Sequence, residues 1–239
     1  MSTIYLIPAR SGSKGIKNKN VIKLGMLPLF VWSVIHAKFL SKRNDLIVVS
    51  SDSVKILEIA SALGVVPLKR PKNISGDKSS TEDTIFHTLK KTQGMGSYQF
   101  LCLLQPTSPF RTKNTLKHLE KKFDQEVYDS VLTVKSVHNL YWNNSKSAKP
   151  LYKTRKMRQD LNNFAESGMY YKSKIESINS NQNRVSGKTL LIKNEEIESI
   201  EIDSIFDLKI ANFLIPEAEK EWKKEILEAK KIIHNIIEI

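Results

Sequence analysis

Short apolar runs alternate with longer amphipathic stretches over the first 135 residues of the chain. Strands are expected at residues 3–9, 45–52, 65–68, 98–105 and 129–134, and helices at 28–40, at 54–63, from about 81 and from about 113. Continuous apolar runs are typical of parallel strands that helices cover on both faces. The pattern therefore predicts an α/β fold with a mostly parallel sheet.

The alternation stops between residues 136 and 187, where the chain becomes polar, basic and aromatic, with stretches such as LYWNN, KTRKMRQD and FAESGMYY. Regularity returns with the runs KTLLIK and SIEID, followed by two expected helices at 205–214 and about 217–237. We therefore expect a core formed by residues 1–135 and 188–239, with an inserted lobe at 136–187.

The chain carries a strong positive net charge. The chain has 239 residues and a formal net charge of +13, from 38 Lys and Arg against 25 Asp and Glu. The excess favours an anionic partner such as a nucleotide, nucleic acid, acidic sugar or membrane surface, although solvated helix faces would give the same total. The single cysteine, Cys102, lies in the apolar run FLCLL and is expected to be a buried hydrophobe.

No apolar stretch approaches the roughly 20 residues that cross a bilayer, and the first residues do not resemble a signal peptide. We therefore expect a cytoplasmic protein that does not enter a membrane.

The first expected loop, IPARSGSKGIKNKN at residues 7–20, combines two glycines with several cations. It matches neither the P-loop pattern nor the dinucleotide pattern G-x-G-x-x-G. Backbone N–H groups on a glycine-rich turn beside Arg10 and Lys14 are nevertheless suited to a polyphosphate. A solvated basic loop is the alternative interpretation.

Two further loops follow expected strands, at the sheet edge where α/β proteins bind ligands. In RPKNISGDKSSTED, Ser80 and Asp83 have the spacing of a capping box, which does not account for Arg70. In LLQPTSPFR, the Gln105 amide could recognise a nucleobase edge or could satisfy the loop backbone.

The segment IEIDSIFDL places Glu201 and Asp203 in alternation with two isoleucines, which predicts a strand with both carboxylates on one face. Such a pair could chelate a hard cation such as Mg²⁺. Alternating surface charge is the other interpretation. Asp207, three residues after Ser204, is expected to cap the following helix.

In this order, the segments IPARSGSKGIKNKN, SSD, KRPKNISGDKSSTEDTIFHTL, LLQPTSPFR, SVLTV and IEIDSIFDLKIAN resemble the acylneuraminate cytidylyltransferase family over residues 4 to about 212. The resemblance implies a Rossmann-like nucleotidyltransferase sandwich of three layers with a small inserted dimerisation lobe. It also implies a reaction between CTP and a nine-carbon 2-keto acid sugar that releases pyrophosphate, in a homodimer that binds no nucleic acid.

The resemblance also implies roles for individual residues. Nucleotide binding is expected of Arg10, Gly12, Ser13, Lys14, Lys19, Asn20, Arg70, Ser80 and Gln105. Sugar binding is expected of Gln105, Arg158, Gln159 and Tyr171. Glu201 and Asp203 would hold Mg²⁺ or Mn²⁺, and Arg10, Lys19 and Asp203 would be catalytic.

The chain departs from the family pattern near the expected sugar site. Ala165 and Ser167 stand where family members commonly have arginine and asparagine, and Lys17 replaces a common proline. We therefore expect an acceptor other than N-acetylneuraminate, such as a legionaminate-like or pseudaminate-like sugar. A Kdo-activating enzyme, a basic nucleic-acid-binding protein and an inactive sugar-nucleotide sensor are the alternatives.

Overall fold

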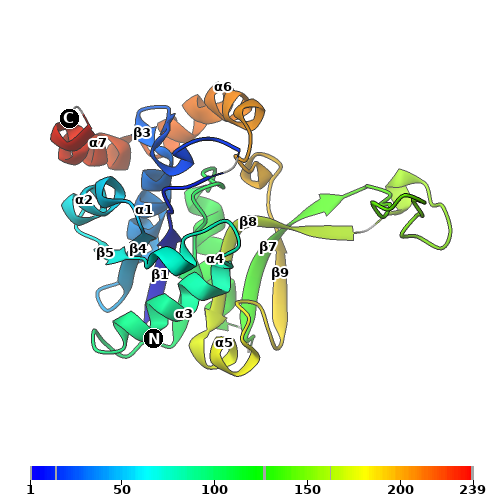
Figure 1. Cartoon of the computed structure of the whole chain (residues 1–239), viewed down its shortest axis with the longest axis horizontal. Helices are drawn as coiled ribbons and strands as arrows, with labels where there is room; N and C mark the ends of the chain where they lie inside the picture. The colour runs from blue at the N-terminus through cyan, green and yellow to red at the C-terminus, as the bar shows by residue number, and fades with distance from the viewer. Residues whose placement is uncertain (1, 14, 126–127, 162, 238–239) are drawn as a thin grey trace.

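The computed structural model describes residues 2–13, 15–125, 128–161 and 163–237. A seven-stranded sheet with the order β5-β4-β1-β6-β8-β7-β9 forms the centre of the protein (Figure 1). Its strands are β1 (Thr3–Pro8), β4 (Leu46–Ser51), β5 (Val66–Lys69), β6 (Phe100–Leu103), β7 (Ser130–Val137), β8 (Asn163–Lys174) and β9 (Thr189–Lys193). Only β8 runs antiparallel to its neighbours, which confirms the expected mostly parallel sheet.

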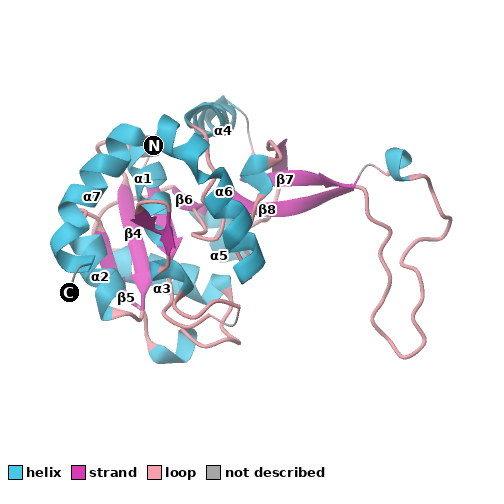
Figure 2. Ribbon diagram, turned by 90° about the horizontal axis from the view of Figure 1, so that it is seen from above, coloured by secondary structure: helices cyan, strands magenta, loops and turns pink. Residues whose placement is uncertain are grey.

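Helices cover both faces of the sheet (Figure 2). They are α1 (Leu29–Leu40), α2 (Val54–Ala62), α3 (Thr81–Thr92), α4 (Lys113–Gln125), α5 (Ile175–Asn181), α6 (Ile205–Glu221) and α7 (Lys223–Ile237). Successive residues of β1 alternate between two hydrophobic cores: Tyr5 and Ile7 pack on the side of α1, α4 and α7, whereas Ile4 and Leu6 pack on the side of α3 and α5. A small hairpin, β2 (Lys23–Leu24) with β3 (Leu27–Pro28), precedes α1. The three-layer α/β expectation is confirmed.

Local signals fixed several element boundaries. The capping box of Ser80 and Asp83 starts α3, and a second capping box of Ser204 and Asp207 starts α6, as expected. Gly64 follows α2 with φ of 70°, a conformation that glycine adopts without strain. Among the described helices, none is both long and apolar enough to cross a membrane.

Two sequence expectations at the C-terminal end are wrong. Residues 200–203 form no strand. Instead, the Ile202 N–H donates a hydrogen bond to the Thr107 carbonyl (2.8 Å) in the loop after β6. The expected break between residues 214 and 217 is absent, because α6 continues through Pro216 to Glu221. The chain turns instead at buried Trp222, whose Nε1 donates to the Arg111 carbonyl (2.9 Å).

The segment for which an inserted lobe was expected, residues 136–187, has one part in the main sheet and one part outside it. Strand β8 lies inside the main sheet between β6 and β7, and the pairing of β7 with β8 ends at Val137 and Asn163. The segment between them extends away from the body (Figures 1 and 2). We call residues 138–161 the arm; it contributes no side chain to the hydrophobic cores of the described chain.

Candidate functional site

Three loops at the carboxyl ends of β1, β5 and β6 enclose a cavity of about 200 Å³. We call it the loop cavity, and it is lined by Pro8, Arg10, Gly12, Ser13, Lys19, Asn20, Arg70, Ser79, Ser80, Thr81, Thr84, Gln105, Pro106 and Thr107. Eight of the nine expected nucleotide-binding residues are in this set; the ninth, Lys14, lies outside the described residues. Expected residues as far apart in the sequence as Arg10 and Gln105 therefore share one cavity.

Ion pairs and hydrogen bonds tie the first loop to its neighbours. The Arg10 Nη2 lies 2.9 Å from Asp77 Oδ1 in the second loop. The Ser11 N–H and hydroxyl donate to the two carboxylate oxygens of Asp52 at 2.7 and 2.6 Å. Burial alone would raise the pKa of Asp52, but the hydrogen bonds from Ser11 lower it below its ordinary value.

Arg70 is a buried cation in the wall of the loop cavity. Its Nη2 donates to the Ser50 carbonyl (2.6 Å) and its Nε to the Ser50 hydroxyl (3.1 Å) at the end of β4. Burial lowers the pKa of Arg70 to about 10, so the group remains charged at neutral pH. The guanidinium is therefore held rigidly by the strand end.

Lys19 connects the first loop to the acidic segment. Its Nζ donates to Asp203 Oδ1 (2.7 Å) and to the Ile202 carbonyl (2.9 Å). The Lys19 side chain is 11% exposed and that of Asp203 is 71% exposed. Nearby, the buried Asn20 side chain donates to the Arg10 carbonyl (2.8 Å), so it braces the loop backbone as well as lining the cavity.

Two glycines allow the acidic segment to approach the loops. A Cβ on Gly15 would lie 2.0 Å from the Asp203 carbonyl oxygen. A Cβ on Gly168 would lie 2.1 Å from Glu201 Oε1 and 2.7 Å from Gln105 Oε1, and this glycine has φ of 67°. Gly168 was not selected from the sequence, although a glycine within a strand-like run signals close approach of this kind.

The carboxylates of Glu201 and Asp203 lie close enough to influence each other although no strand holds them. Burial, followed by the repulsion from Asp203 and Glu166, raises the pKa of Glu201, while Lys135 and Lys19 oppose this effect. No cluster of three or more His, Cys, Asp or Glu side chains suited to a metal occurs among the described residues. Magnesium, however, is commonly held by one or two carboxylates together with substrate phosphates and water, so this pair fits that ion.

The expected sugar-binding residues do not come together within one chain. Gln105 lines the loop cavity, whereas Tyr171 is buried and donates its hydroxyl to Glu166 Oε2 (2.8 Å). Arg158 and Gln159 are exposed in a short 3₁₀ turn (Arg158–Asp160) on the arm, and neither lines the loop cavity. The arm itself extends away from the body (Figure 1).

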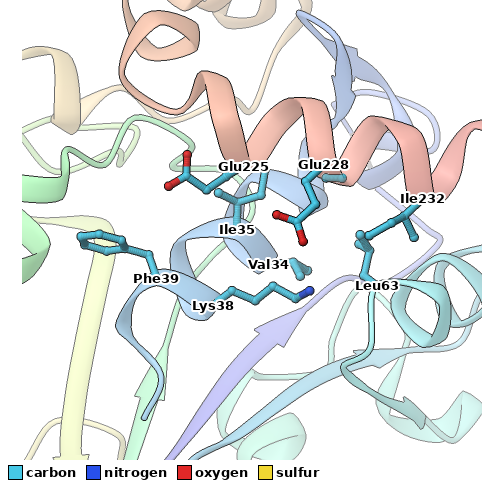
Figure 3. Close-up of a pocket in the computed structure, with 9 residues that line it drawn as sticks. Val34, Ile35, Lys38, Phe39, Leu63, Glu225, Glu228 and Ile232 are labelled. Atoms are coloured by element: carbon cyan, nitrogen blue, oxygen red, sulfur yellow. The ribbon is translucent and has the colours of Figure 1, made fainter. Parts of the chain in front are cut away.

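A second cavity, of about 320 Å³, lies between α1 and α7 (Figure 3). Apolar side chains such as Val34 and Ile232 form much of its wall, and Lys38, Glu225 and Glu228 add charges of both signs. None of the residues selected from the sequence lines it. The loop cavity, with its cations and helix N-terminus, is therefore the better candidate for an anionic ligand.

Comparison with known proteins agrees with this geometry. A family model described as cytidylyltransferase matches residues 4–209. The chain belongs to the cytidylyltransferase family. Its residues are 37% identical over 132 positions to the N-acylneuraminate cytidylyltransferase of Escherichia coli O18:K1:H7, covering 55% of this chain and 30% of that protein.

Two further relatives are bacterial. The pseudaminic acid cytidylyltransferase of Campylobacter jejuni serotype O:23/36 is 37% identical over 127 residues, 52% of this chain and 54% of that protein. The post-translational flagellin modification protein B of Campylobacter coli is 30% identical over 227 residues, 91% of this chain and 96% of that protein. The aligned parts thus span from about a third to nearly all of these relatives.

Solved structures share the fold at low identity. The CMP:2-keto-3-deoxy-manno-octonic acid synthetase complexed with CTP matches with a TM-score of 0.66 and 11% identity, covering 91% of this chain and 100% of that chain. The 4-diphosphocytidyl-2C-methyl-D-erythritol synthase from Anaerococcus prevotii gives a TM-score of 0.63 and 14% identity, with coverage of 90% and 98%. The expected Rossmann-like nucleotidyltransferase fold is confirmed.

Proposed function

We propose that this member of the family transfers CMP from CTP to the anomeric hydroxyl of a nine-carbon 2-keto acid sugar and releases pyrophosphate, in the cytoplasm. The observation that carries the proposal is the convergence of Arg10, Lys19, Arg70, Ser80 and Gln105 on one cavity. This set supplies cations for a triphosphate, a helix N-terminus and an amide that can recognise a base or a sugar.

In such a transfer the protein mainly orients the reactants and neutralises charge that develops on phosphate oxygens. Arg10 and Lys19 are placed for this neutralisation, and the N-terminus of α3 at Ser80 adds backbone N–H groups. Glu201 and Asp203 would hold Mg²⁺ or Mn²⁺ together with the phosphates. A bound divalent ion supplies charge stabilisation to the leaving pyrophosphate.

The acceptor is proposed to be a sugar of the legionaminate or pseudaminate type. Ser167 is buried and donates to the Thr133 hydroxyl (2.8 Å), so it is oriented into the protein. Ala165 lies opposite Lys135 on β7 and offers no hydrogen bond of its own. Neither side chain therefore offers an acceptor the polar groups of an arginine or an asparagine.

We further propose that two chains form a homodimer through their arms. Tyr141, Trp142 and Met157 on the arm are exposed, which is unusual for side chains of this size unless a partner covers them. A second chain would also allow Arg158 and Gln159 to reach a loop cavity that their own chain does not bring near them.

Pyrophosphate release from CTP and Mg²⁺ with a panel of 2-keto acid sugars tests the proposal. The panel contains N-acetylneuraminate, legionaminate, pseudaminate and Kdo, and ATP, GTP and UTP serve as nucleotide controls. We expect turnover with CTP and a legionaminate-like or pseudaminate-like acid. A clear preference for N-acetylneuraminate or Kdo would overturn the proposed acceptor, and no turnover with any acid would overturn the function.

A further inference from the structure

Arg111, the last residue of the segment LLQPTSPFR, is a buried cation that the proposed chemistry does not use. Its side chain is among the largest fully buried ones, with 2% exposure, and it does not line the loop cavity. In the described part of the chain its guanidinium contacts four acceptors, none of them a carboxylate. Burial lowers the pKa of Arg111 to about 9, so the charge is retained at a cost in solvation.

The four contacts join the central strands to α1. Nη2 donates to the Gln105 carbonyl (2.7 Å) and Nε donates to the Met169 carbonyl (2.8 Å). Nη1 donates to the Ser33 hydroxyl and to His36 Nδ1, each at 3.2 Å; the imidazole must accept because a guanidinium has only donors. One planar group thus fixes the backbone at the end of β6 relative to the backbone of β8.

The two carbonyls, of Gln105 and Met169, lie next to the place where Gln105, Gly168 and Glu201 approach one another. Met169 follows Gly168, where an added Cβ would collide with both the Gln105 amide oxygen and the Glu201 carboxylate. The Gln105 carbonyl also accepts from the Ser108 N–H (3.2 Å) and the Ser33 hydroxyl (3.4 Å). Arg111 therefore holds the main chain of Gln105 itself and the main chain of Met169, which follows the glycine that the Gln105 side chain approaches.

We infer that Arg111 is a positioning residue, which acts through Gln105 to aim its amide into the loop cavity and to keep Gly168 against Glu201. The inference rests on the proposed function, in which Gln105 contacts the substrates. The planar fork of arginine can bridge two carbonyls and a hydroxyl at fixed angles, whereas lysine is a point charge on a flexible stem. Displacements of about 1 Å in such supports can cost about a hundredfold in rate.

A double-mutant cycle tests the inference. Arg111→Lys, Gln105→Ala and the double variant are compared by kcat/KM for pyrophosphate release. We expect each single change to lower kcat/KM by about 10-fold to 100-fold, and the double variant to lie within about threefold of the worse single variant, because both changes disable one unit. Losses that multiply, or an Arg111→Lys variant within about threefold of the wild type, would overturn the role.

Two companion variants separate positioning from folding. Ser33→Ala removes one acceptor of the guanidinium and the weaker donor to the Gln105 carbonyl, and leaves the buried charge in place. It serves if Arg111→Lys does not fold, and its smaller loss should also be non-additive with Gln105→Ala. Tyr170→Phe is the matched control, because it removes a different, partly buried hydrogen bond made by β8, from the Tyr170 hydroxyl to Glu120 Oε1 (2.7 Å). We expect it to lower the melting temperature and leave kcat/KM unchanged.

The same cycle is measured on the dissociation constant of CTP by calorimetry without acceptor. A wild-type protein that binds CTP but releases no pyrophosphate would contradict the proposed function. Non-additive losses of CTP affinity would then still support the role of Arg111, whereas additive or absent losses would overturn it.

Discussion

Gly12 and Gly15 lie three residues apart in the first loop and differ in what surrounds them. A Cβ on Gly12 would meet no atom within 4 Å in the described structure, whereas a Cβ on Gly15 would collide with the Asp203 carbonyl. Gly12 therefore has no steric role in the fold, and its position on the loop cavity suggests close approach of backbone to phosphate.

We predict that Gly12→Ala weakens CTP binding at least about tenfold while the melting temperature stays within about 2 °C of the wild type, since a methyl group would occupy space needed by phosphate oxygens. Gly15→Ala should instead lower the melting temperature markedly. Calorimetry with CTP and thermal unfolding measure the two effects. Wild-type CTP affinity in Gly12→Ala would remove this glycine from the proposed phosphate site.

Asp203 is suited to a test of the metal site, because its side chain is largely exposed and its ion pair with Lys19 contributes little to stability. We predict that Asp203→Asn lowers Mg²⁺-dependent pyrophosphate release by about a hundredfold or more without a large change in melting temperature, since the amide is a poor ligand for a hard cation. Near-normal turnover at saturating Mg²⁺ would exclude Asp203 as a ligand. Glu228→Gln, in the cavity between α1 and α7, is the acidic control and should retain full activity.

At the scale of elements, the end of β4 is joined to the first loop by Asp52. Its folded-state pKa is lowered, so the carboxylate stabilises the fold above its unfolded value of about 4, and this contribution is lost as the pH falls through the folded-state pKa. Hydrogen bonds to charged groups contribute up to a few kcal/mol, and partial solvent exposure reduces this to about 1 kcal/mol here.

We therefore predict that Asp52→Asn lowers the melting temperature by about 2–4 °C near neutral pH and that the difference from the wild type shrinks as the pH falls below about 4, the ordinary pKa of the carboxyl. Ser11→Ala keeps the carboxylate and removes one donor, so it should show a smaller loss with the same direction of pH dependence. A difference that does not change with pH would mean that the charge of Asp52 does not stabilise the loop.

The elements also show where sequence patterns are sufficient. Apolar runs and capping signals located β1, β4, β6, α1, α2 and α3 because each is determined by local period and caps. The run SIEID has the period of a strand, yet only Ile202 is buried and no neighbouring strand pairs with it. The helix boundary was expected between residues 214 and 217, but α6 ends at buried Trp222 instead.

The residues of the candidate site also fall into those that the sequence could identify and those that it could not. Residues within contiguous loop motifs, such as Arg10 and Ser80, could be selected from the sequence because the ends of parallel strands share one edge of the sheet. Gly168 and Asp77 could not, because their importance depends on which distant group each approaches. Arg158 was selected by resemblance and lies in the 3₁₀ turn on the arm. Whether it reaches a loop cavity is a question for the proposed dimer.

At the scale of the whole molecule, the proposed dimer assigns nucleotide binding to the loop cavity and part of the sugar binding to the arm. In the proposed dimer, Arg158 and Gln159 of one chain act at the loop cavity of the other. Arg158→Ala/Gln159→Ala should therefore retain the dimer and bind CTP normally, but lose turnover with the acid sugar. Light scattering, calorimetry and pyrophosphate release measure these three properties, and normal turnover would place both residues outside the site.

Mixing two inactive variants then tests whether the site is shared between chains. Asp203→Asn disables a loop cavity and leaves its arm intact, whereas Arg158→Ala/Gln159→Ala disables an arm and leaves its loop cavity intact. In a symmetric dimer, half of the exchanged molecules are mixed, and each carries one fully intact site, so about a quarter of wild-type activity should return. Recovery requires that the arm of one chain serve the cavity of the other. If exchange is verified by light scattering of a size-tagged chain and activity does not return, each site is completed within its own chain and the proposed assembly is wrong.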